Sequence, residues 1–181
     1  LVVRAPWIKI GQTWNIEFHM GVDGLSVLLV LLTTFLTPLA IASTWDAIQD
    51  RVREFMIFFL LLEVGMTGVF VAQDPFLFYI FWEVMLLPMY FLIGIWGGPR
   101  REYAAIKFFL YTLVGGVLML IALLMFYFGS GAERSLDLIR LAQIGQGRVP
   151  GVLFDDTMQI IAFILLFIGF AIKVPVFPFH T

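Results

Sequence analysis

The sequence has no cysteine, so neither a disulfide scaffold nor a cysteine site for zinc or an iron–sulfur cluster is possible. Charged residues make up only 13% of its 181 residues and form no basic run interleaved with aromatic residues, which gives no sign of a nucleic-acid partner. Apolar residues are abundant instead: they account for 61% of the chain, and the mean hydropathy is +0.99. A soluble domain cannot hide that much apolar surface. The composition therefore predicts an all-α membrane protein.

About five apolar windows are long enough to cross a bilayer as helices of roughly 20 residues each. The predicted transmembrane helices cover residues 25–43, 55–72, 75–96, 103–128 and 157–173. We expect them to form a single transmembrane domain over residues 1–181. The chain starts without methionine and stops just after a proline-rich motif, so we expect a fragment of a longer subunit.

The longest polar stretch, residues 129–156, is expected to be an outer interfacial segment. Within it, residues 133–143 put Leu136, Ile139 and Ala142 near one face, which is typical of a short amphipathic helix lying at the interface. The arginines favour this orientation because the two short loops on the other side carry several of them, and short basic loops remain cytoplasmic. They are Arg51, Arg53, Arg100 and Arg101.

Glu83 lies inside the third predicted helix. A carboxylate near the bilayer centre costs on the order of 3 kcal/mol, so a membrane protein usually keeps one for ion movement or for a buried partner. Tyr79 and Tyr90 follow the same helical face, and Pro88 leaves the carbonyl of Val84 without its usual N–H donor. The pattern predicts a hydratable strip around Glu83, which makes this acid a candidate group for ion translocation.

Lys173 comes near the end of the last apolar window, where Pro175 and Pro178 break the helix. One interpretation is a lysine that snorkels to the membrane surface. The other is a proton carrier, because broken helices inside membranes are tolerated where the freed backbone faces a cavity or an ion path. His180 is the next titratable group beyond the break and is a candidate for passing protons onward.

Two further ionisable residues each allow a functional and a structural interpretation. Glu63 lies in the second predicted helix at a depth similar to that of Glu83, and it is either a functional acid or a buried hydrogen-bonding acid beside small residues. Lys107 lies near the cytoplasmic start of the fourth predicted helix. Snorkelling and a place beside an internal water path would give the same pattern for it.

Six strings, taken in order and spacing, resemble the chain M (subunit 4) family of respiratory complex I. They are GVDGLS (21–26), LTTFLTP (32–38), FWEVMLLPMYFLI (81–93), WGG (96–98), YAAIKFFLYT (103–112) and FAIKVPVFPFHT (170–181). Members of this family are antiporter-like subunits of the proton-pumping NADH:quinone oxidoreductase. The resemblance implies a fold of two inverted five-helix bundles, in which the five helices here correspond to the third to seventh, with the second half absent.

The resemblance also implies roles for particular residues. Glu83 matches the acid of the fifth helix, Lys173 the lysine of the broken seventh helix, and His180 the histidine just beyond the break. It implies a non-redox subunit of a proton-translocating enzyme in a bacterial or mitochondrial inner membrane. Its partners would be other membrane subunits, the lipid bilayer and protons. NADH, FMN, iron–sulfur clusters and quinone would bind other subunits, with no cofactor or metal in this chain.

Three alternatives stay open. The nearest is a subunit of a multisubunit cation/proton antiporter or membrane-bound hydrogenase, which shares the acid and lysine pair; the strings around Glu83 favour chain M instead. A passive membrane scaffold would tolerate Glu83→Gln without loss of function. A self-contained transporter of a small molecule is disfavoured because no cluster of polar groups for such a substrate is visible.

Overall fold

The computed structural model describes residues 2–10, 14–131 and 134–179. Its helices are α1 (Gly24–Ser43), α2 (Val52–Val71), α3 (Pro75–Val84), α4 (Leu86–Trp96), α5 (Arg101–Gly129), α6 (Leu138–Gly145) and α7 (Asp156–Lys173). If α3 and α4 are taken together, five spans in the described residues are long and apolar enough to cross a membrane. The prediction of a mostly helical fold with five such spans is confirmed, and the helix ends differ from the predicted ones by three residues at most.

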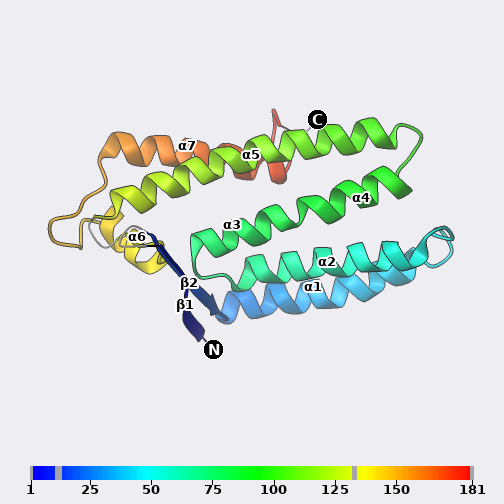
Figure 1. Cartoon of the computed structure of the whole chain (residues 1–181), viewed down its shortest axis with the longest axis horizontal. Helices are drawn as coiled ribbons and strands as arrows, with labels where there is room; N and C mark the ends of the chain where they lie inside the picture. The colour runs from blue at the N-terminus through cyan, green and yellow to red at the C-terminus, as the bar shows by residue number, and fades with distance from the viewer. Residues whose placement is uncertain (1, 11–13, 132–133, 180–181) are drawn as a thin grey trace.

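The spans pack in the order in which they follow one another along the chain. In Figure 1, α1 and α2 form one layer, α3 and α4 the next, and α5 with α7 the last. Close approach depends on glycine. The backbone of Gly68 on α2 lies directly against the Phe81 ring of α3, and a Cβ on Gly169 of α7 would lie 2.9 Å from the carbonyl oxygen of Gly115 on α5. Small residues therefore set the spacing of neighbouring helices, as is common in membranes.

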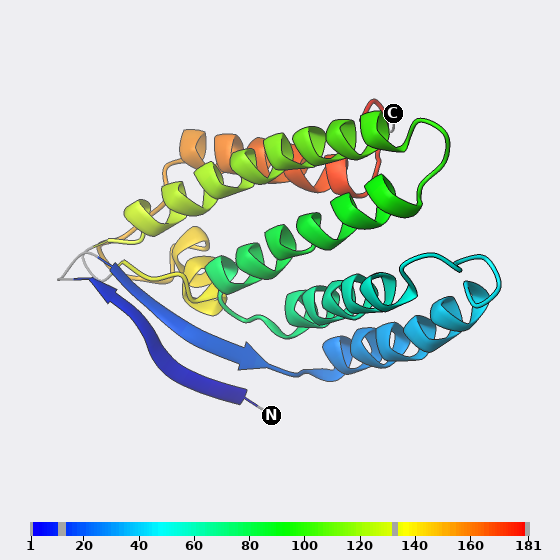
Figure 2. The ribbon, with the colours of Figure 1, turned by 45° about the vertical axis from the view of Figure 1, so that its right-hand side comes forward.

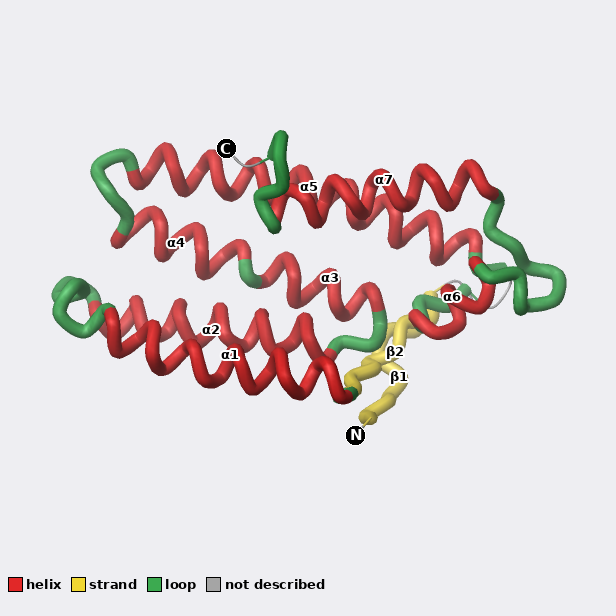
Figure 3. Tube along the Cα trace, turned by 180° about the vertical axis from the view of Figure 1, so that it is seen from behind, coloured by secondary structure: helices red, strands yellow, loops and turns green. Residues whose placement is uncertain are grey.

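The third span is interrupted at Met85, between α3 and α4, where a single continuous helix was predicted. Figure 3 shows the break as a short loop between the two helices. Pro88 explains it, because proline has no N–H to donate to the carbonyl of Val84 and its ring crowds the preceding turn. The ladder resumes when the N–H of Met89 donates to the carbonyl of Met85 at 3.3 Å. The interruption lies two residues beyond Glu83.

A two-stranded antiparallel hairpin precedes α1, formed by β1 (Val2–Ile10) and β2 (Trp14–Gly21). It was not predicted, so the fold is helical with one small hairpin added. The hairpin runs across the ends of the helices beside α6 (Figure 2). It is tied to the link between α2 and α3, because the N–H of Gln73 donates to the carbonyl of His19 at 2.9 Å.

The amphipathic helix exists, but its predicted register is wrong. Helix α6 begins at Leu138 because the side chain of Asp137 accepts the N–H groups of Ile139 and Arg140, which makes Asp137 its N-cap. The buried face therefore carries Leu141 and Ile144, while Ile139 and Ala142 are exposed. Leu136, the third residue of the predicted face, is buried but precedes the helix. These buried side chains pack with Tyr127 and Phe154.

Different segments of the chain lie at the two ends of the helix bundle. Figure 1 shows the α1–α2 and α4–α5 loops at one end, and the hairpin and α6 at the other. The arginine-bearing loops thus share an end, as the predicted orientation requires. Which end faces the cytoplasm stays a prediction.

Candidate functional site

Glu83 projects from α3 toward α5. Its Oε1 is buried and has no hydrogen-bond partner among the described residues. The oxygen lies against the backbone of Gly116, in space that any larger residue would occupy with its Cβ. A buried polar atom without a partner costs free energy, and in a membrane helix such an acid is a candidate for function.

Lys173 is the last residue of α7, and its side chain reaches across to α3. Its Nζ donates to the carbonyl oxygen of Trp82 at 3.3 Å and lies 4.9 Å from the centroid of the Trp82 ring. The fold thus brings Lys173 to the residue that directly precedes Glu83. No ion pair joins Lys173 to Glu83: the ion pairs of the described residues join Arg4 to Glu17 and Asp137, and Arg51 to Glu54.

The predicted helix break after Lys173 is present. The N–H of Val174 still donates to Phe170, and the carbonyl of Ala171, which Pro175 cannot bind, accepts the N–H of Val176 at 2.9 Å. The chain then turns away from the helix. His180 lies outside the described residues, so its role stays a prediction.

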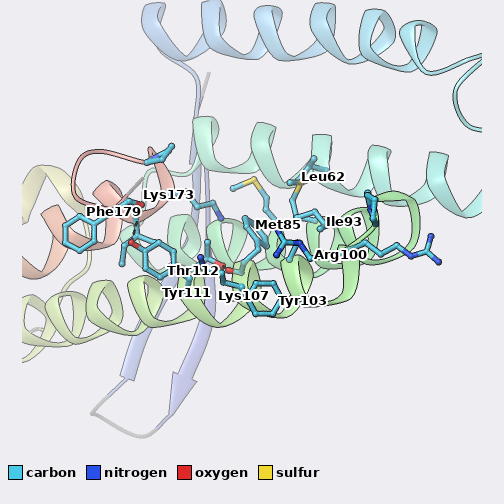
Figure 4. Close-up of a pocket in the computed structure, with 18 of the residues that line it drawn as sticks. Leu62, Met85, Ile93, Arg100, Tyr103, Lys107, Tyr111, Thr112, Lys173 and Phe179 are labelled. Atoms are coloured by element: carbon cyan, nitrogen blue, oxygen red, sulfur yellow. Dashed lines mark hydrogen bonds between the residues drawn. The ribbon is translucent and has the colours of Figure 1, made fainter. Parts of the chain in front are cut away.

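A groove of about 790 Å³ leads from the arginine-bearing end of the bundle to Lys173. It runs between α2, α4, α5 and the end of α7, and Figure 4 shows residues that line it. Arg100 lies at one end, Lys107, Tyr111 and Thr112 of α5 follow, and Lys173 lies at the other. The structure thus places Lys107, an exposed residue, on the same groove as Lys173.

The hydroxyl of Tyr111 donates to the carbonyl of Phe179 at 3.2 Å, which holds the segment after the helix break beside this groove. Polar side chains and backbone groups are therefore available along the groove, from its charged end to the ammonium of Lys173.

Glu63 lies apart from this constellation. It is half-buried on α2, and its side chain forms no hydrogen bond or ion pair with another described residue. Gly65 of α2 faces Met85 and Gly68 faces Phe81, so Glu83 lies at the level of the stretch between these glycines, although its side chain points to α5. Glu63 is about one helical turn further along, near the predicted depth, but the structure does not bring the two acids together.

Two residues of the site were missed in the sequence. Trp82 entered the sequence analysis only as part of the string FWEVMLLPMYFLI that resembles chain M, and Gly116 was not singled out as a site residue. An aromatic residue directly before a membrane acid is a weak signal for the first. No sequence signal indicates that Gly116, rather than another small residue, faces Glu83, because that depends on how α5 packs against α3.

Comparison with known proteins agrees with this geometry. Residues 72–181 match the family described as "NADH:quinone oxidoreductase/Mrp antiporter, TM", and residues 4–71 match "NADH-ubiquinone oxidoreductase chain 4, amino terminus". NADH-quinone oxidoreductase subunit M of Rhodobacter capsulatus is 46% identical over 179 residues, which cover 94% of this chain and 34% of that protein. NADH-ubiquinone oxidoreductase chain 4 of Prototheca wickerhamii is 42% identical over 166 residues, covering 91% of this chain and 30% of that one.

The fold agrees as well. A chain in the structure of respiratory complex I from Thermus thermophilus with bound NADH superposes with a TM-score of 0.78 at 30% sequence identity. The match covers 99% of this chain and 35% of that one, so the chain spans about a third of the length of the relatives it matches. The predicted resemblance and antiporter-like fold are confirmed. The chain belongs to the NADH:quinone oxidoreductase/Mrp antiporter membrane family, and within it is similar to subunit M, or chain 4.

Proposed function

We propose that this chain forms part of the proton path in the membrane arm of an NADH:quinone oxidoreductase, with Glu83 and Lys173 as proton-carrying groups. One observation carries the proposal. Lys173 at the end of α7 reaches the carbonyl of Trp82, directly beside a carboxyl group that has a buried, unpartnered oxygen. Ionisable groups so placed inside membrane helices are expensive and mark ion paths.

The mechanism is electrostatic. An ionised Glu83 stabilises the ammonium form of Lys173 through space, and a neutral Glu83 does not. In a site with an effective dielectric constant near 20, two unit charges interact by ~4 kcal/mol at about 4 Å, and the energy falls in inverse proportion to their separation. A change of charge on Glu83 can therefore decide whether Lys173 holds or releases its proton. The chain itself needs no redox step for this.

The groove supplies the approach to Lys173. Lys107, Tyr111 and Thr112 line it with polar groups that can orient water, so protons would enter from the arginine-bearing end. His180 would then be the next group beyond the helix break. Glu63 would modulate the field at Glu83 from about one helical turn away.

The free energy that drives proton pumping would come from redox chemistry in other subunits. NADH, FMN, iron–sulfur clusters and quinone would bind there, and this chain would act as a non-redox translocase subunit among other membrane subunits in a bacterial or mitochondrial inner membrane. A cation/proton antiporter is the alternative. The match of residues 4–71 to the amino terminus of chain 4 favours the oxidoreductase.

The test is Glu83→Gln in the assembled complex, because glutamine keeps the shape and removes the charge. We expect at least a ~10²-fold loss of proton pumping, the lower end of what a positioned proton-transfer group contributes, with assembly intact. Glu83→Asp should keep much of the activity. Glu102→Gln, an exposed residue at the start of α5, is the matched control and should pump normally. Normal pumping by Glu83→Gln in sealed vesicles would refute the proposal.

A further inference from the structure

Trp82 offers two groups to the ammonium of Lys173. Its carbonyl oxygen accepts a hydrogen bond at 3.3 Å, and its ring centroid lies 4.9 Å from the same Nζ. The ring distance lies within the about 6 Å reach of a cation–π interaction. These contacts link α3 to α7 beside the helix end at Lys173.

The indole ring is held from both helices. Phe78, one turn earlier on α3, stacks on it with ring centroids 5.4 Å apart and planes 28° apart. Phe170, one turn before Lys173 on α7, meets it edge-on at 5.4 Å and 90°. Packing against these two rings therefore orients the indole toward the ammonium.

We propose that Trp82 is a positioning residue that binds the protonated side chain of Lys173 through its ring face. This inference rests on the proposed function of Lys173 as a proton carrier. The face of an indole attracts a cation because of the ring quadrupole, and it attracts a neutral amine much less. Trp82 thus favours the protonated form of Lys173 over the neutral form.

This contact gives the ammonium of Lys173 a partner on α3 other than the Glu83 carboxylate. The lysine keeps a partner on α3 while the Glu83 carboxyl lies against Gly116 of α5. The acid can then change its charge without first breaking an ion pair with the lysine. A stable ion pair would instead hold both groups in their charged forms.

The competing explanation is that Trp82 only fills space among aromatic rings. Volume and ring electrostatics can be separated by fluorinated tryptophans, since ring fluorines weaken the attraction for a cation with little change of shape. The chain has five tryptophans, so the analogues must be introduced at position 82 alone. Proton pumping by the assembled complex in sealed vesicles is then measured for analogues with one, two and three ring fluorines.

We expect the pumping rate to fall stepwise with each added fluorine. Trp82→Leu should lose ~10-fold, the equivalent of one buried cation–π contact, and Trp82→Phe, which keeps a ring, should lie between it and the parent. Phe78→Leu is the matched control: it removes a ring of the same cluster that makes no cation–π contact with Lys173 among the described residues, and it should retain more activity than Trp82→Leu. A rate that does not change across the fluorinated series would overturn the proposal, even if Trp82→Leu fails to assemble.

Two reference variants separate this inference from the proposed function. If Glu83→Gln and Lys173→Met pump normally, the proton-path assignment itself fails. If both are inactive while the fluorinated Trp82 series matches the parent, only the role of Trp82 fails. If both are inactive and the series declines stepwise, both proposals stand.

Discussion

Asp74 is a buried acid at the hairpin end of the bundle, only 4% exposed, and it predicts a pH-dependent stability. It is the N-cap of α3, where its Oδ1 accepts the N–H of Phe76 at 2.8 Å and that of Leu77 at 3.1 Å. Burial raises the pKa of Asp74 from the ordinary 3.8 to about 6. The two cap bonds oppose this shift, and the nearby carboxylates of Glu17 and Asp137 add to it.

Proton linkage determines whether ionised Asp74 raises or lowers the free energy of unfolding. Because the pKa of Asp74 is higher in the folded chain, the folded chain holds a proton between pH 3.8 and about 6 that the unfolded chain has released. Ionised Asp74 therefore lowers the free energy of unfolding above pH 6, and this cost disappears as the pH falls below 3.8. At 1.36 kcal/mol for each pH unit, the cost is ~3 kcal/mol at about pH 8 and ~1 kcal/mol at about pH 4.5.

Asp74→Asn removes this cost and keeps the cap, because asparagine is as good an N-cap residue as aspartate. We expect the variant to be more stable than the parent by up to ~3 kcal/mol at about pH 8 and by ~1 kcal/mol at about pH 4.5. The measurement is unfolding of the chain by SDS in mixed micelles, followed by tryptophan fluorescence at both pH values.

Asp23→Asn is the matched control. Asp23 is the exposed N-cap of α1, and hydrogen bonds from Ser26 lower the pKa of its carboxyl. Its ionised form therefore stabilises the fold at neutral pH, and that contribution is lost as the pH falls through the folded pKa. Asp23→Asn should destabilise at about pH 8, the opposite sign to Asp74→Asn. The reasoning is refuted if Asp74→Asn is less stable than the parent at about pH 8, or if its offset does not change with pH.

Other variants test the proton carrier and the helix packing. Lys173→Arg in the assembled complex should abolish proton pumping in sealed vesicles, because a guanidinium with a pKa above about 12 does not release its proton; full activity would show that this position does not release one. Gly68→Ala should lower the free energy of unfolding in mixed micelles by ~1–3 kcal/mol, because its Cβ would overlap the Phe81 ring. Gly24→Ala is its control and should be neutral or slightly stabilising, since nothing lies within 4 Å of that Cβ; equal losses for the two would contradict the packing argument.

The membrane-spanning helices were predictable because the bilayer leaves the backbone little choice. Without water to bind N–H and C=O groups, an apolar window of sufficient length must form a helix, whatever its neighbours are. The cap at Asp23 and the short link at Gln73 and Asp74 then set the ends to within a few residues. The break at Met85 was predictable only in part. Pro88 indicated the lost hydrogen bond, but not that the helix would end at Val84 and a new one begin at Leu86.

The hairpin and the face of α6 were not predictable in the same way. Strands β1 and β2 are not long apolar runs, and each exists through pairing with the other, for example between Ala5 and Phe18. In α6 the choice of Asp137 as N-cap moves Leu136 out of the helix and turns Ile139 outward. A periodicity argument fixes the spacing of a helical face but not the residue at which the helix begins.

In the candidate site, too, some features were predictable from the sequence and others depend on how the helices pack. Glu83 and Lys173 were predicted as candidates because charge in a membrane helix is expensive, and that cost is a property of each residue and its own window. Their relation is not, since the hydrogen bond from Lys173 to Trp82 joins residues 91 positions apart. The contacts that organise the pair come from a backbone carbonyl, an indole face and the absent side chain of Gly116. Such groups carry no charge that the sequence would reveal, yet in the fold they contact the lysine and the acid. If Trp82 and Gly116 set the placement of the lysine and the acid, substitutions at these two uncharged positions should change pumping while leaving both ionisable residues in place.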